Sequence, residues 1–279
     1  MSQSDSPTSA APRPRRVRVH HLREMKEAGE KITMLTAYDY PTALIMDRAG
    51  IDMLLVGDSY GTTMLGYDTT IPVTVDELVV ATRSVSRAVE RAMVVADLPF
   101  GSYEQSPAQC LATSARLLKE GGANAVKFEG GRQVAEHVAA CTRFGIPVVG
   151  HLGFTPQAEN TLGGKRVQGR GDGAVERLTE DALALQEAGA CAVVLEMVPS
   201  PAAAAVTQAL TVPTIGIGAG VDCDGQVLVW TDMAGLGDWA PRFSKRFGEV
   251  GAELTRAVEA YRDEVRSGTF PDAERSFEA

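Results

Sequence analysis

Acidic side chains stand directly after short apolar runs at three places in this sequence. Asp97 ends the run in VVADLPFGSYE (residues 94–104), Asp58 follows LLVG, and Glu129 follows VKF. Aspartate is a common turn residue and helix cap, so capping alone is the alternative explanation. If the three lie together, two charges about 4 Å apart repel by about 4 kcal/mol at an effective dielectric constant of about 20. Such a cluster protonates or binds a cation, and oxygen ligands favour Mg²⁺.

Further ionisable residues occupy the same kind of position, which predicts a ring of them. Lys127 precedes Glu129 by two residues, so both side chains point to one face of a strand. Lys127 then either pairs with Glu129 or holds an anionic substrate. His151, in VVGHLGF, is either a member of the ring or a hydrogen-bonded core residue. The whole ring comprises Asp39, Asp58, Asp97, Lys127, Glu129, His151, Glu196 and Asp232.

Glu196 is the candidate for a general base. It follows four apolar residues and precedes Met-Val-Pro, so it faces the ring from the side opposite the three carboxylates. A carboxylate in that position can remove a proton from a bound substrate. The alternative is a salt bridge to a loop arginine, either Arg166 or Arg170.

Eight short apolar runs, each bounded by glycine, proline or polar residues, provide the elements that would position these side chains. Most are continuously apolar, as expected of parallel strands that are covered on both faces. The predicted strands span residues 32–39, 52–59, 93–100, 125–130, 147–154, 191–198, 214–220 and 227–233. The count, and the absence of a GxGxxG loop after the first strand, favour a single-domain (β/α)8 TIM barrel over an open doubly wound sheet. Catalytic residues of such barrels lie at the C-terminal ends of the strands.

Helical patterns fill most of the segments between the strands, at residues 74–91, 106–121, 132–144 and 174–188. Asp39 is also a plausible cap for a helix beginning near Pro41. The link between the seventh and eighth strands is too short for a helix, which predicts an irregular barrel there. Residues 242–266 are expected to form a long C-terminal helix packed against the outside of the barrel. Residues 64–73 and 160–173 form long loops after the second and fifth strands.

Composition excludes several classes of function. The net charge of −9 argues against a nucleic-acid-binding surface, and no apolar run is long enough to cross a membrane. The four cysteines occur singly, without CxxC spacing, which indicates reduced thiols in a cytoplasmic protein. Residues 1–19 are rich in Ser, Pro, Ala and Arg, and their prolines and Asp5 fit a targeting helix poorly. We therefore expect a disordered N-terminal arm over 1–19 and a catalytic barrel with its C-terminal helix over 20–279.

A series of motifs in order along the chain resembles the ketopantoate hydroxymethyltransferase family, from about His21 to Phe277. The motifs are TAYDY, LLVGDSYG, GYDTTIPVTVDEL, VVADLPFGSYE, VKFEGG, GHLGFTPQ, LGGKRVQGRGD, LEMVP, IGIGAG with DGQVLV, and FPDAERSF. The chain departs from the family pattern at Ala158-Glu159, at the residue before Ser276, and in its N-terminal arm. The isocitrate lyase and phosphoenolpyruvate mutase superfamily shares the barrel and Mg²⁺-enolate chemistry but lacks this motif set.

The resemblance implies a (β/α)8 barrel that assembles as a homodecamer and binds one Mg²⁺ per subunit. By position, the family's metal ligands correspond to Asp58, Asp97 and Glu129, and its catalytic base to Glu196. The 2-oxo acid substrate would contact a second group of residues, namely Asp58, Ser59, Asp97 and Lys127, with Tyr38 and His151 as neighbours.

The reaction that the resemblance implies belongs to pantothenate biosynthesis. A hydroxymethyl group is transferred from the cosubstrate 5,10-methylenetetrahydrofolate to 3-methyl-2-oxobutanoate, which gives 2-dehydropantoate. Two other readings remain open: a folate-independent lyase or mutase with the same ring, and a non-catalytic barrel that serves as a scaffold or metabolite sensor.

Overall fold

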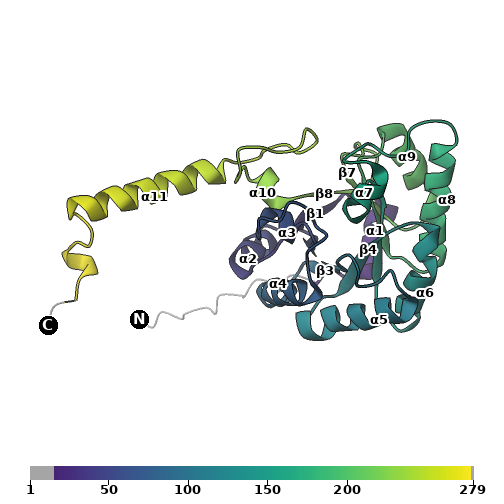
Figure 1. The fold of residues 1–279 in the computed structure, drawn as a ribbon, viewed down its shortest axis with the longest axis horizontal. Helices are drawn as coiled ribbons and strands as arrows, with labels where there is room; N and C mark the ends of the chain where they lie inside the picture. The colour runs from purple at the N-terminus through teal and green to yellow at the C-terminus, as the bar shows by residue number, and fades with distance from the viewer. Residues whose placement is uncertain (1–15, 278–279) are drawn as a thin grey trace, which may run out of the picture.

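Eight parallel strands close into a barrel in chain order, from β1 next to β2 round to β8 next to β1. The computed structural model describes residues 16–277 (Figure 1). The strands are β1 (Ile32–Thr36), β2 (Met53–Val56), β3 (Met93–Asp97), β4 (Ala125–Glu129), β5 (Val148–Gly153), β6 (Ala192–Glu196), β7 (Thr214–Ile217) and β8 (Gly225–Leu228). The predicted barrel is therefore confirmed.

Both faces of most strands are buried, which explains their continuously apolar sequences. Alternate residues such as Met34, Met53 and Val95 fill the interior of the barrel. The other residues, such as Leu54 and Phe128, pack outward against the helices. The register places Asp97 beside Lys127 and Glu129 beside His151 on neighbouring strands. Paired residues of parallel strands point to the same side of the sheet, so these side chains share one end of the barrel.

Helices follow most strands and cover the outside of the barrel (Figure 1). They are α2 (Tyr40–Arg48), α3 (Tyr60–Thr63), α4 (Val75–Ala88), α5 (Pro107–Arg116) with the π-helical turn η1 (Leu117–Gly121), η2 (Arg132–Val134), α6 (Ala135–Arg143), η3 (Pro156–Ala158), α7 (Glu159–Leu162), α8 (Ala174–Glu187) and α9 (Ser200–Ala209). Side chains cap several of them: Asp39 accepts from the Thr42 N–H at the start of α2, and Thr74 forms a capping box with Glu77 at the start of α4.

The C-terminal third corrects two predictions. The eighth strand ends at Leu228, and the predicted residues 230–233 instead form the short helix α10 (Trp230–Met233). Residue 225, the first of this strand, must be a glycine, because a Cβ there would lie 2.5 Å from the Ile32 carbonyl oxygen of β1. The predicted long helix begins at Val250 rather than 242, and none of the residues of α11 (Val250–Ser267) is buried. This helix extends away from the barrel instead of packing against it (Figure 1). A short 3-10 turn, η4 (Ala273–Arg275), follows.

The N-terminal end of the barrel is closed by residues 16–18 and the helix α1 (Val19–Ala28). The buried Val17 donates its N–H to the Arg91 carbonyl oxygen at 2.7 Å. Residues 16–20 line a cavity of about 270 Å³ together with Met93, Asn124 and Pro147, which lie at the starts of strands or just before them. Residues 1–15 of the predicted arm lie outside the described residues.

The four cysteines are buried and none forms a disulfide, as their spacing predicts. In residues 16–277, no helix combines the length and apolar character that a membrane span requires.

Candidate active site

One cavity of about 740 Å³ lies at the C-terminal ends of the strands and contains most of the predicted ring. Its walls include Asp58, Asp97, Lys127, Glu129, His151, Glu196 and Asp232. Asp39 is the member of the predicted ring that does not line the cavity, because both of its carboxylate oxygens bind Thr42 at the start of α2. The other predicted members thus line one cavity, Asp232 from α10 rather than from the eighth strand, and Asp39 is a helix cap.

Lys127 and Asp97 form a buried ion pair at the centre of the ring. Lys127 Nζ lies 2.8 Å from Asp97 Oδ1, and both side chains are almost fully buried. The Asp58 N–H donates to the other oxygen, Asp97 Oδ2, at 3.0 Å. Lys127 therefore pairs with Asp97 and not with Glu129, which was one of the two alternatives for this lysine. Burial raises the pKa of Asp97 to about 6, although Lys127 opposes the shift. Burial and the nearby Glu129 likewise raise the pKa of Asp58 to about 6.

His151 connects the acidic ring to Glu196. Its Nδ1 lies 3.5 Å from Glu129 Oε1, and its Nε2 lies 3.3 Å from Glu196 Oε2. Burial and Lys127 lower the pKa of His151, but the neighbouring carboxylates of Glu129 and Glu196 outweigh them and raise it to about 9. The predicted alternative partners of Glu196, Arg166 and Arg170, form no ion pair with it within residues 16–277.

Two unusual backbone conformations fix the position of Glu196. Gly153, at the end of β5, has φ +91°, and a Cβ there would lie 2.2 Å from the Glu196 carbonyl oxygen. That oxygen accepts the N–H of Phe154 at 2.8 Å. Met197 has φ 48°, a left-handed conformation that is costly for a residue with a side chain. The chain is therefore held in a strained turn directly after the candidate base.

Tyr38 and Ser59 lie beside the ring at different depths. Ser59 lines the cavity, whereas Tyr38 is buried behind it and does not. The Tyr38 hydroxyl and Ser59 Oγ are 2.8 Å apart, so Tyr38 can orient the serine. Burial raises the pKa of Tyr38, which keeps its hydroxyl protonated.

The charges of the ring suit a divalent cation. Five carboxylates (Asp58, Asp97, Glu129, Glu196 and Asp232) face two cations (Lys127 and His151), which leaves a net charge of −3 when all are ionised. Buried Asp97 Oδ1 accepts no hydrogen bond of regular geometry from the described part of the chain. The ring carboxylates do not bring three ligand atoms within 4.8 Å of one another. A Mg²⁺ site is compatible with this wide spacing of the carboxylate oxygens, because Mg²⁺ in proteins usually keeps several waters and is held through one or two carboxylates plus substrate.

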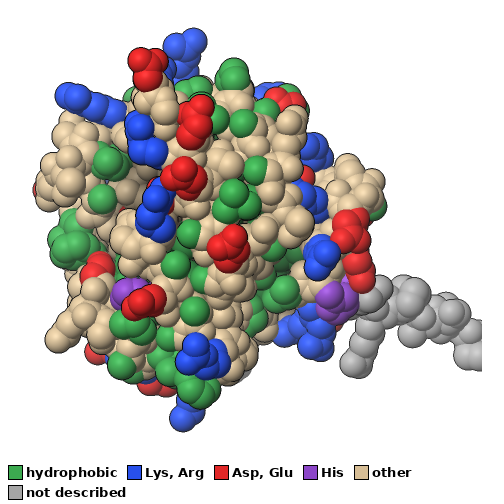
Figure 2. Space-filling view, turned by 90° about the vertical axis from the view of Figure 1, so that its right-hand side faces the viewer, with side chains coloured by type: hydrophobic (Ala, Val, Ile, Leu, Met, Phe, Trp, Pro, Cys, Tyr) green, Lys and Arg blue, Asp and Glu red, His purple; other side chains and the backbone are tan. Residues whose placement is uncertain are grey.

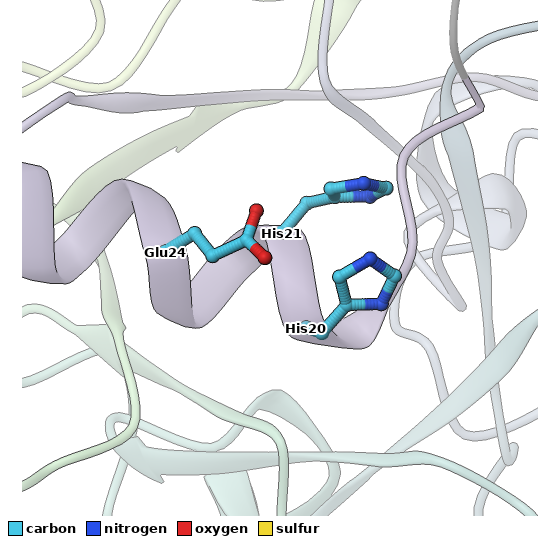
Figure 3. A group of neighbouring side chains, drawn as sticks. All are labelled: His20, His21 and Glu24. Carbon is cyan, nitrogen blue, oxygen red and sulfur yellow. The ribbon is translucent and has the colours of Figure 1, made fainter.

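A second group of possible metal ligands lies at the opposite end of the barrel. Figure 3 shows His20, His21 and Glu24 next to one another on α1, and their ligand atoms lie within 4.8 Å of one another. His20 and Glu24 are exposed, and His21 Nδ1 already accepts the Arg18 N–H at 2.9 Å. The group is outside the cavity that contains the ring, so it has no part in the chemistry considered above.

Sequence reasoning missed two buried residues that contact the ring. Gln157 donates its Nε2 to Asp58 Oδ2 at 2.9 Å, and its backbone N–H to Glu129 Oε2 at 3.0 Å. Tyr103 donates its hydroxyl to Gln157 Oε1 at 2.8 Å. Both residues stand inside quoted motifs, VVADLPFGSYE and GHLGFTPQ, but an uncharged side chain in a loop gives no sign of burial.

The fold and this site define a class of protein: a (β/α)8-barrel enzyme with a buried acidic ring at the C-terminal mouth of the barrel. The model of the ketopantoate hydroxymethyltransferase family matches residues 16–273. A curated relative from Saccharopolyspora erythraea, named 3-methyl-2-oxobutanoate hydroxymethyltransferase, is 60% identical over 99% of this chain and 94% of its own length. A relative of the same name from Rhodococcus jostii is 60% identical over 94% of this chain and 91% of its own length. The chain therefore belongs to the ketopantoate hydroxymethyltransferase family, and it is an enzyme.

Solved structures with the same architecture are more distant in sequence. Phosphonopyruvate hydrolase in complex with oxalate and Mg²⁺ superposes with a TM-score of 0.58, at 13% identity over 93% of each chain. The 2,3-dimethylmalate lyase, a member of the PEP mutase/isocitrate lyase superfamily, superposes with a TM-score of 0.56, at 18% identity over 92% of this chain and 91% of that chain. At these identities the likeness shows the fold alone.

Proposed function

We propose that this enzyme transfers a hydroxymethyl group from 5,10-methylenetetrahydrofolate to 3-methyl-2-oxobutanoate, giving 2-dehydropantoate for pantothenate synthesis, with Mg²⁺ as cofactor. Family membership supports the reaction. The observation that carries the mechanism is the joining of the acidic ring to Glu196 through His151, with Glu196 Oε2 3.3 Å from the imidazole. This arrangement places a binding site for an anionic 2-oxo acid next to a base.

Lys127 and the neighbouring side chains bind the 2-oxo acid. Lys127 Nζ is the buried cation of the site and attracts the substrate carboxylate, while Ser59 Oγ can donate a hydrogen bond to it. The cation site would be held by Asp58, Asp97 and Glu129, directly or through water. Mg²⁺ bound there supplies Lewis-acid stabilisation of the negative charge that develops on the keto oxygen. Without the charge of the cation the ring, at a net −3, would repel the acid.

Glu196 removes the proton from C3 of the substrate, and His151 holds its carboxylate in place. The methylene carbon is bonded to both N5 and N10 of the folate. One of these bonds breaks as the enolate carbon bonds to the methylene carbon, and the other breaks as the oxygen of a water molecule bonds to it. The proton taken from C3 and one proton of the water end on the two nitrogens, so the products are 2-dehydropantoate and tetrahydrofolate. The cavity volume of about 740 Å³ leaves room for the larger cosubstrate beside a five-carbon acid. The apolar Trp239 and Phe243 on its wall suit the aromatic ring of a pterin.

Proton NMR of 3-methyl-2-oxobutanoate in D2O tests the proposal. With protein, tetrahydrofolate and Mg²⁺ we expect loss of the C3 proton signal, followed by the hydroxymethyl product when formaldehyde is added. Neither change should occur with EDTA. Mg²⁺-dependent exchange without any transfer would indicate a lyase or mutase with the same ring. Absence of exchange in every condition would refute the proposed chemistry.

A second copy of this chain is the partner that the surface indicates. In α11 the apolar side chains Val250, Leu254, Val258, Tyr261 and Val265 form one stripe at helical spacing, each 43–61% exposed. On the face shown in Figure 2, by contrast, hydrophobic side chains lie singly among charges of both signs. In the described part of the chain, β8 is followed by the four-residue helix α10 and then by α11, which extends away from the barrel (Figure 1). Thr33 of β1 and Gln226 of β8 are accordingly exposed, whereas β2, β3, β4 and β7 are wholly buried. The α11 helix of a partner copy would cover the uncovered strands.

Light scattering on the full chain measures this assembly, for which the resemblance suggests a decamer. Leu254→Glu places a charge in the stripe and should lower the mass of the particle. The matched control Ala252→Glu alters an exposed position on the opposite side of α11 and should leave the mass unchanged. Equal masses for wild type and Leu254→Glu would contradict this mode of assembly.

We assign the enzyme to the cytoplasm, since its four cysteines are unpaired.

A further inference from the structure

We propose that Gln157 is a positioning residue that holds Asp58 and Glu129 ready for a divalent cation, with Tyr103 stabilising the orientation of its amide. The inference rests on the proposed use of Mg²⁺ and adds a role for two uncharged residues that were not predicted to be part of the site. Both are buried, at 7% and 3% exposure, and neither lines the cavity. They contact the ring carboxylates from the side that faces away from the cavity.

The amide of Gln157 has one satisfied orientation. Its Nε2 donates to Asp58 Oδ2 at 2.9 Å and to the Leu98 carbonyl oxygen at 3.0 Å. Its Oε1 accepts from the Tyr103 hydroxyl at 2.8 Å, and the same hydroxyl lies 3.3 Å from the Glu129 N–H. Flipping the amide would set Oε1 against two acceptors. Asp58 and Leu98 therefore set the orientation of the amide, and the Tyr103 hydroxyl stabilises it by donating to the amide oxygen.

The backbone of Gln157 holds the second carboxylate. Gln157 is the second residue of the short turn η3, after Pro156, which has no N–H. The Gln157 N–H is therefore the first donor of that turn, and donors at the start of a helical turn have no partner within it. It donates to Glu129 Oε2 at 3.0 Å. One residue thus fixes one oxygen of Asp58, which lies two residues after β2, and one oxygen of Glu129 at the end of β4.

The neutral charge of Gln157 matters as much as its hydrogen bonds. A lysine or arginine there would also satisfy two carboxylates, but it would cancel the charge that attracts a divalent cation. Gln157 orients Asp58 and Glu129 and leaves the net charge of the ring at −3. Lys127, in contrast, is a cation and pairs with Asp97 at 2.8 Å. A methionine would fill the buried volume of the glutamine without its polar groups, so filling space alone does not require the amide.

Titration of the enzyme with Mn²⁺, followed by the electron paramagnetic resonance signal of the free ion, tests the inference without depending on activity. In Gln157→Met we expect the dissociation constant for Mn²⁺ to rise about 10–100-fold, as is usual when a residue supporting a metal ligand is lost. Tyr103→Phe keeps the aromatic side chain packed on Phe128, whose ring centroid lies 5.3 Å from that of Tyr103. It should therefore raise the dissociation constant for Mn²⁺ by a smaller factor. Excess Mg²⁺ should restore C3 proton exchange in Gln157→Met, because the bound state remains competent.

The matched control is Thr207→Val, which removes buried hydrogen bonds to Ala203 and Thr214 far along the chain from the ring. It should lower the melting temperature but leave Mn²⁺ affinity unchanged. Wild-type Mn²⁺ affinity in both Gln157→Met and Tyr103→Phe would overturn this inference and leave the proposed function standing. Weakened binding in Thr207→Val equal to that in Gln157→Met would overturn it too, because the effect would then be general. Absence of Mn²⁺ binding by the wild type would overturn both proposals. If Gln157→Met does not fold, Tyr103→Phe decides by the same criterion.

Discussion

Removing the buried cation of the ring should destabilise the protein in a pH-dependent way. Lys127→Met keeps the length of the side chain but leaves Asp97 ionised and unpaired next to Asp58 and Glu129. At 2.8 Å the Lys127–Asp97 attraction is about 6 kcal/mol at an effective dielectric constant of about 20, before the cost of burying both groups. Breaking one partner of a buried pair typically costs about 3–5 kcal/mol. We expect a loss of that size at pH 8 in EDTA.

The sign of the pH effect follows from Asp97. Its folded pKa is about 6 with Lys127 in place, already above its ordinary value because of burial, and it rises further without the lysine. A carboxyl group with a raised folded pKa loses stability as the pH rises through the interval between its unfolded and folded values. The variant should therefore recover part of its deficit between pH 8 and pH 5.

Urea unfolding at pH 8 and pH 5, at one fixed protein concentration and with EDTA, measures both effects. Adding Mg²⁺ at pH 8 should stabilise Lys127→Met more than wild type, since a divalent cation replaces part of the missing charge. A variant as stable as wild type at pH 8, or a deficit that is the same at both pH values, would refute the assignment of Lys127 as the charge that offsets this ring.

Three further predictions concern the base, the backbone that holds it, and a helix cap. Glu196→Gln should slow C3 proton exchange by at least about 100-fold with Mn²⁺ affinity unchanged, and normal exchange would remove Glu196 from the role of base. Gly153→Ala should displace Glu196 and cost about 1–3 kcal/mol or more. Its control Gly145→Ala has a similar φ of +81° with nothing within 4 Å, so it should keep full activity, and equal activity in both variants would contradict the argument. Glu77 has a lowered pKa through its bonds to Thr74 N–H, so Glu77→Ala should cost about 0.3–1.5 kcal/mol near pH 7. That difference should shrink in thermal unfolding as the pH falls below the ordinary glutamate pKa of about 4.3 and through the lower folded value, where the wild-type carboxylate protonates; a constant difference would exclude the ionised cap.

The sequence by itself determined the barrel and most of its ring. Continuous apolar runs require strands that are buried on both faces, and ionisable residues at the ends of such runs meet at one mouth because parallel strands end on the same side. Asp58, Asp97, Lys127, Glu129 and Glu196 were identified in this way, and all of them line the cavity. A local signal also located the cap of α2, since a cap depends on residues within one turn.

Tertiary structure alone decided which of these groups interact. Lys127 stands two residues from Glu129, yet its ion pair is with Asp97, because the register of β3 and β4 places those two side by side. The roles of Gln157 and Tyr103 arise from loops that meet behind the ring, a long-range contact that no local pattern encodes. The stripe on α11 has the periodicity of a packed helix, and a sequence shows that such a face needs a partner. It does not show whether the partner is the same barrel or another copy, because helical periodicity carries no information on what lies opposite.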